Sequence, residues 1–88
     1  MDQTKKIEKI VTKDDYRVTL TIVAITKYSQ KITAECNGHK AEKSISYSSL
    51  NFVQADAEKE LQNSIDAMVA KAIALSQVGD FVEKYQNQ

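Results

Sequence analysis

The chain contains few residues that interrupt or bend a polypeptide backbone. Its 88 residues include no proline and only two glycines. No Pro-, Gly- or Ser-rich linker and no internal repeat divides it, so we expect a single domain over residues 1–88. Two glycines also cannot build the glycine-rich loops that bind dinucleotides or nucleoside triphosphates, which excludes those sites.

Cysteine and histidine occur once each, as Cys36 and His39. A lone cysteine excludes an intramolecular disulfide and fits a reducing compartment. A structural zinc site would need two carboxylates or a second chain besides this pair. Nucleophilic catalysis by Cys36 and His39 is not indicated, because no third orienting group and no oxyanion hole accompany the pair. Catalysis by paired carboxylates is not indicated either, because Asp14-Asp15 are explained by a turn and the acids of residues 56–60 by the helix dipole. We therefore expect a non-enzymatic protein with no catalytic residue, metal or cofactor.

Long apolar runs are also missing. The start of the chain, MDQTKKIEKIV, lacks the apolar run of a signal peptide, and no segment is apolar enough to span a bilayer. We expect residence in the cytoplasm of a cell or an infected host. The formal net charge is zero, but residues 1–50 carry nine basic and six acidic residues, and residues 51–88 carry three and six. This asymmetry predicts that the two halves attract each other, and neither half has the charge density of a dedicated nucleic-acid binder.

The first half of the chain has the period of β-strands. Apolar residues alternate with polar ones over residues 16–26, which predicts a half-buried strand. Val23 and Ile25 fall on the polar side, so either this strand end is covered on both faces or a β-bulge shifts its register. Residues 5–13 form a strand or a frayed arm, in which Ile7 and Val11 share one face. A turn at residues 13–15 and a loop at residues 27–30 flank the clear strand.

Residues 31–47 carry the strongest local signal in the sequence. Asn37-Gly38 is typical of a two-residue type I′ turn, which requires positive φ at both central positions. Such a turn places Cys36 opposite His39 and Glu35 opposite Lys40. The resulting apolar face consists of Ile32, Ala34, Cys36, Ala41, Ile45 and Tyr47.

The second half of the chain predicts a long helix over about residues 54–77. Its apolar stripe runs at spacings of three and four through Ala57, Leu61, Ile65, Met68, Ala72 and Leu75, widened by Val69 and Ile73. Gly79 suggests a stop, followed by a short helix over about 80–86. The stripe is wider than a small sheet needs, so either the short helix folds back through Phe81, Val82 and Tyr85 or a second chain covers it. The expected fold is α+β, with a three- to four-stranded antiparallel meander, within about residues 5–53, packed on the long helix plus the short terminal helix.

The function best supported by these features is protein binding. Apolar residues on an otherwise polar sheet face often mark an interface, and exposed tyrosines often anchor one. The candidate interface residues are Val23, Ile25, Ile10, Tyr28 and Tyr85. We predict contact with a partner protein, or a homodimer through this face or an edge strand. Small, neutral domains without motifs are common among phage and mobile-element accessory proteins, including inhibitors that mask a partner's surface.

Nucleic-acid binding by the outer sheet face is the alternative. Its candidate residues are Arg17, Lys31, Lys40 and Lys9. The order of strands followed by a helix is similar to the last two-thirds of a double-stranded-RNA-binding domain. That family has a glycine-rich lead and a Ser-Lys-Lys run at its final helix, whereas this chain has SSLNFVQADAEKE, with acids in place of lysines. The charge at that end is wrong for phosphate contact, so nucleic acid is disfavoured.

Overall fold

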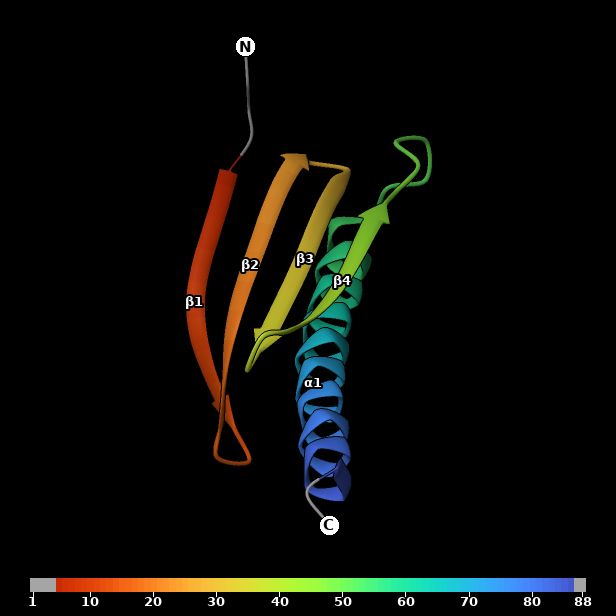
Figure 1. Cartoon of the computed structure of the whole chain (residues 1–88). Coiled ribbons are helices and arrows are strands. Elements are labelled where there is room, and N and C mark those ends of the chain that lie inside the picture. Colours follow the sequence, from red (N-terminus) through yellow and green to blue (C-terminus); the bar gives the residue numbers. More distant parts are fainter. Residues whose placement is uncertain (1–4, 87–88) are drawn as a thin grey trace.

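The computed structural model describes residues 5–86, which form a four-stranded antiparallel sheet and one long helix (Figure 1). The strands follow one another as a meander in the order β1-β2-β3-β4. The elements are β1 (Lys5–Lys13), β2 (Tyr16–Thr26), β3 (Ser29–Cys36), β4 (His39–Ser46) and α1 (Gln54–Gln86). The predicted α+β class is confirmed, and residues 5–13 are a strand rather than an arm.

Two tight turns set the register of the sheet. Asp14 and Asp15 join β1 to β2 with φ of 51° and 69°, and Asn37 and Gly38 join β3 to β4 with φ of 52° and 84°. Positive φ at both central residues is the geometry of a type I′ turn, whose twist matches that of the flanking strands. The β3–β4 register has Cys36 opposite His39, as the sequence predicts.

A β-bulge near the end of β2 explains why its alternation weakens. Ala24 pairs with Gln30 and Thr26 pairs with Ser29, so Ile25 is the extra residue. The sequence left this choice open, and the bulge is the outcome. The predicted loop over residues 27–30 is too long, because Ser29 and Gln30 already pair with β2 and β4.

The hydrophobic core lies between α1 and the inner face of the sheet, which is the face turned toward the helix. The sheet buries Val18, Leu20, Ile32, Ala34, Cys36, Ala41 and Ile45, and the helix contributes Val69, Ala72 and Ile73. The apolar face predicted for the β3–β4 hairpin is thus confirmed. Within residues 5–86, α1 packs on β4 and β3, less on β2, and not on β1.

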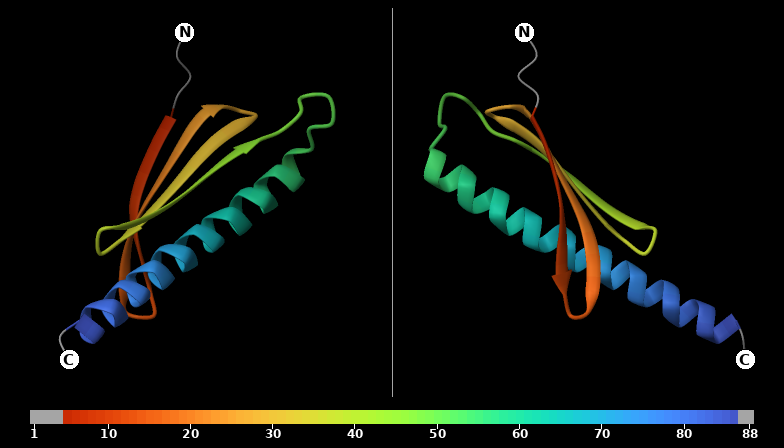
Figure 2. Two further views of the ribbon diagram at one scale, coloured as in Figure 1. Left: turned by 45° about the vertical axis from the view of Figure 1, so that its right-hand side comes forward. Right: turned by 90° about the vertical axis from the view of Figure 1, so that its left-hand side faces the viewer.

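The predicted break in the helix is wrong. A single helix of 33 residues runs through Gly79 to Gln86, and the separate short helix is not found (Figure 2). A Cβ at position 79 would stand 2.7 Å from Nε2 of His39, so Gly79 serves as a point of close approach to the hairpin instead of a helix end. Beside it, Nδ2 of Asn37 donates a hydrogen bond to Oγ of the buried Ser76 at 2.8 Å.

Candidate interaction surfaces

The five residues proposed as an interface lie in separate places. Ile10 pairs with Thr19, and Val23 pairs with Lys6 four residues further along β2. That separation is roughly 13 Å along the strand, so Ile10 and Val23 share the outer face without forming one patch. Ile25 is 48% exposed at the bulge.

The two tyrosines of that set are at opposite ends of the molecule. Tyr28 lies in the β2–β3 turn, and its ring packs nearly perpendicular to the ring of Phe52, with a centroid distance of 4.9 Å and an interplanar angle of 84°. Its carbonyl accepts a hydrogen bond from the Tyr47 amide at 2.8 Å, so Tyr28 stabilises the connection from β4 to α1. Tyr85 is on the last turn of α1 and is 71% exposed.

The outer face is not a basic patch. Arg17, Lys31 and Lys40 do lie on it, but Lys31 forms a 3.7 Å ion pair with Glu42 and Lys40 pairs across the strands with Glu35. Alternating signs weaken the attraction for a phosphate backbone.

The placement of Lys9 on the outer face is wrong. Lys9 pairs with the buried Leu20, and paired residues share a face. Lys9 therefore lies on the inner face and takes no part in the basic set proposed for nucleic acid.

Cys36 and His39 face each other across the β3–β4 turn, as predicted. Cys36 is only 1% exposed, and the His39 ring lies against Gly79. Among residues 5–86 no cluster of three or more His, Cys, Asp or Glu side chains is placed to hold a metal ion. In the same part of the chain, no helix combines the length and the apolar character needed to span a membrane.

Tyr47 links the start of α1 to the sheet. Its hydroxyl donates a hydrogen bond to the carbonyl of Ala57 at 3.2 Å. Burial raises the pKa of Tyr47 above its ordinary value of 10.0, and the negative charge of Glu60 raises the pKa further. Both causes favour the neutral phenol, which is the form that can donate this hydrogen bond.

One uncovered surface beside β1 is a groove that sequence reasoning missed. Because α1 does not reach β1, a hollow of about 510 Å³ and another of about 290 Å³ lie between α1 and the first two strands. We define the open groove by Ile7, Lys9, Val11, Ile22, Ala24, Leu61 and Ile65. Ile7, which lines the larger of these two hollows, is 56% exposed.

The sheet side of the open groove is basic. Lys5, Lys9 and Lys13 alternate along β1 with Ile7 and Val11, so all five share the inner face. This period of two is visible in KKIEKIVTK and is the signal that could have identified the surface.

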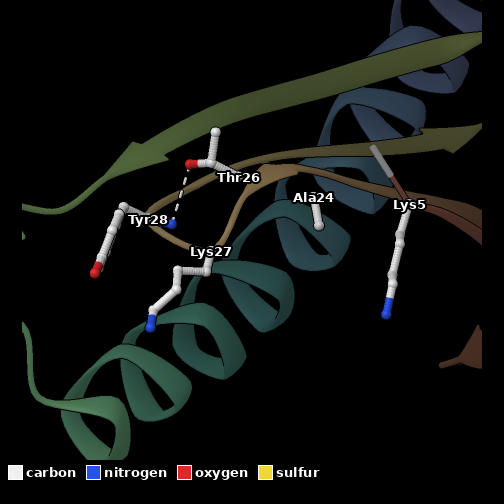
Figure 3. Close-up of a pocket in the computed structure, with 5 residues that line it drawn as sticks. All are labelled: Lys5, Ala24, Thr26, Lys27 and Tyr28. Carbon is white, nitrogen blue, oxygen red and sulfur yellow. Dashed lines mark hydrogen bonds between the residues drawn. The ribbon is translucent and has the colours of Figure 1, made fainter. Parts of the chain in front are cut away.

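A third hollow, of about 520 Å³, adjoins the groove at the end of β2. Figure 3 shows Lys5, Ala24 and Lys27 lining this hollow, in which Lys27 adds a fourth lysine to the basic side. Glu58 and Asp66 line the helix side of the groove, so the lysines outnumber the acids there.

A second uncovered apolar surface lies at the end of α1. We call it the helix-end stripe, and it consists of Leu75, Val78, Phe81, Val82 and Tyr85, which are 37–71% exposed. Sequence reasoning placed three of these residues on a short terminal helix that either folds back on the long helix or leaves the cover to a second chain. The continuous helix leaves them in solvent instead.

No known protein family matches this chain, and no curated protein or solved structure is significantly similar to it.

Proposed function

We propose that this chain is a small, non-enzymatic protein-binding module that holds an acidic and apolar segment of a partner protein in the open groove. The observation that carries the proposal is the state of β1. Ile7 is 56% exposed on the face of the sheet that elsewhere forms the core. An antiparallel sheet normally has one covered and one solvated face. Here the helix covers the inner face over β2, β3 and β4 but leaves the inner face of β1 exposed.

The charges around the groove indicate which kind of partner segment would bind there. Lys5, Lys9, Lys13 and Lys27 surround the apolar floor of the groove, against Glu58 and Asp66 on the helix side. A segment with apolar residues and flanking carboxylates would bury Ile7 and neutralise the excess lysines. Binding of this kind would mask part of the partner's surface, as an inhibitor of a cytoplasmic protein would do, including one from a phage or mobile element.

The outer face has less support as the binding surface. Ile10, Val23 and Ile25 are dispersed, and the ion pair of Lys31 with Glu42 lowers the attraction for nucleic acid. A homodimer through the outer face or an edge strand stays a prediction. The lysines of β1 argue against an edge-to-edge pair, because edge lysines discourage strand addition.

Two matched variants test the surface. Ile7→Asp should abolish capture of a partner from an extract of the native host, while Val23→Asp on the outer face should leave capture unchanged. Circular dichroism checks that both variants fold. Retained capture with Ile7→Asp and lost capture with Val23→Asp would move the site to the outer face.

A cross-linking experiment tests the charge. A carbodiimide joins amines directly to carboxylates, so mass spectrometry should find Asp or Glu of the captured partner attached to Lys5, Lys9 or Lys13. Cross-links confined to Lys31 or Lys40 would contradict the proposal. Binding to RNA or DNA whose affinity falls steeply with salt would instead favour the nucleic-acid alternative.

A further inference from the structure

The helix-end stripe has the spacing of a coiled-coil seam. Leu75, Val78, Val82 and Tyr85 follow one another at intervals of three, four and three residues, which are the a and d positions of a heptad repeat. Their side chains are 37%, 61%, 53% and 71% exposed. A helix surface that faces only water is normally polar, so a seam of this kind indicates a missing partner helix.

Charged residues are absent from this side of the helix end. At 3.6 residues per turn, Asp80, Glu83 and Lys84 fall on the side opposite the seam. Phe81, which is 67% exposed, lies directly beside the seam and widens it. The stripe therefore offers an uninterrupted apolar surface over about three turns.

We propose that two copies of the chain pair through their helix-end stripes, antiparallel about a two-fold axis. In this arrangement Leu75 lies opposite Tyr85 of the second copy, and Val78 lies opposite Val82. Positions a and d then face each other, and Phe81 approaches its own counterpart near the axis. The interface is isologous, because the same stripe supplies both of its sides.

Charge favours a second copy as the occupant. A two-fold axis brings each central residue near its own counterpart, so charges at the centre would repel, and the residues that meet here are uncharged. Lys71 continues the line of the seam one turn before Leu75 and is exposed. In the antiparallel pair it lies about one turn past Tyr85 of the second copy, near the C-terminal end of that helix, where the partial negative charge of the helix dipole attracts a cation.

The exposed area indicates a weak, concentration-dependent dimer. Phe81 and Tyr85 have roughly 200–350 Å² per copy left to bury, taking 150–250 Å² for each whole side chain. With the smaller residues added, the buried total stays near or below about 1,200 Å², which is the size of transient complexes. The stripe and the open groove share no residue, so this pairing does not rest on the proposed function.

Light scattering over a concentration series tests the pairing. The average mass measured for the wild-type chain should rise from the monomer mass of 9.9 kDa toward twice that value at high micromolar concentration. Val82→Asp should weaken association at least about 100-fold, because each dimer loses two buried valines. Ile7→Asp, in the groove, is the matched control and should dimerise like the wild type. A wild-type chain that stays monomeric throughout would overturn the proposal.

Disulfide trapping tests the antiparallel register. In a Cys36→Ala background, a mixture of Leu75→Cys and Tyr85→Cys proteins should form a mixed disulfide. Neither protein should cross-link with itself, because the ten-residue offset separates like positions by about 15 Å along the helix, beyond disulfide reach. Self-cross-linking of both variants would mean a parallel pair and would refute the proposed arrangement.

Discussion

Replacing Gly79 with alanine tests how the end of α1 is held against the sheet. The position lies inside the helix, where the hairpin tip approaches through His39 and Asn37. An added Cβ would stand 2.7 Å from Nε2 and 3.0 Å from Cε1 of the His39 ring. Two opposing effects therefore act on the free energy of unfolding.

The favourable effect is helix propensity, since alanine in a helix interior stabilises the helix by about 1 kcal/mol relative to glycine. The unfavourable effect is displacement of the ring, which starts roughly 0.8 Å inside an ordinary contact distance of about 3.5 Å. Moving a side chain off its rotamer costs about 0.5–1.5 kcal/mol. In the wild-type background, Gly79→Ala should thus change stability by no more than about 0.5 kcal/mol in either direction.

In a His39→Ala background the obstruction is absent, so the same substitution should stabilise the domain by about 1 kcal/mol. Urea denaturation of the four proteins, followed by circular dichroism, gives the coupling free energy, which should be about 0.5–1.5 kcal/mol. Ala70→Gly is the matched control, because Ala70 is an exposed position on the same helix. Ala70→Gly should lower the free energy of unfolding by about 1 kcal/mol in both backgrounds.

Two results would refute the reasoning. A gain of about 1 kcal/mol in both backgrounds would mean that the helix end does not pass against His39. A loss in both backgrounds would mean that Gly79 ends the helix in a left-handed conformation, as the sequence alone suggests.

Two other predictions concern the core and the pH dependence of stability. Ile32→Ala, at a fully buried position, should lower the free energy of unfolding by about 2–5 kcal/mol, and a loss below about 1 kcal/mol in urea denaturation would contradict the packing against α1. The raised pKa of Tyr47 means that its stabilising effect is complete below pH 10.0 and is lost as the pH rises through the folded-state pKa. Tyr47→Phe should therefore lose less stability than the wild type between pH 8 and pH 11 in thermal melts, and equal losses would argue against the shift.

Local sequence signals were enough to predict most of the sheet. Asn37-Gly38 fixed a turn, and the turn fixed which residues of β3 and β4 face each other. Period-two alternation then assigned the buried face correctly for Ile32 and Ile45. These features depend on residues close in the chain, and the structure confirms them.

The features that the sequence did not predict depend on distant contacts. Gly79 has the local character of a helix end, but in the structure the helix continues through it and the His39 ring of β4 approaches too closely for a side chain. The buried Ser64 and Ser76 were missed because serine on a helix usually faces solvent, whereas Ser76 here accepts a hydrogen bond from Asn37. The interface candidates do not form one patch for a similar reason, since a shared strand face does not place Ile10 beside Val23.

The dimensions of the elements explain why an open groove exists. A helix is about 10–12 Å wide, whereas the outer strands of a four-stranded sheet lie about 14 Å apart, so one helix cannot cover every strand. The seven residues between β4 and α1 place the helix over β4 and β3, and β1 lies furthest away. Polar residues at positions 7 and 11 would make the uncovered strand ordinary surface. Because Ile7 and Val11 are apolar instead, covering this strand with a partner would lower the free energy of the system.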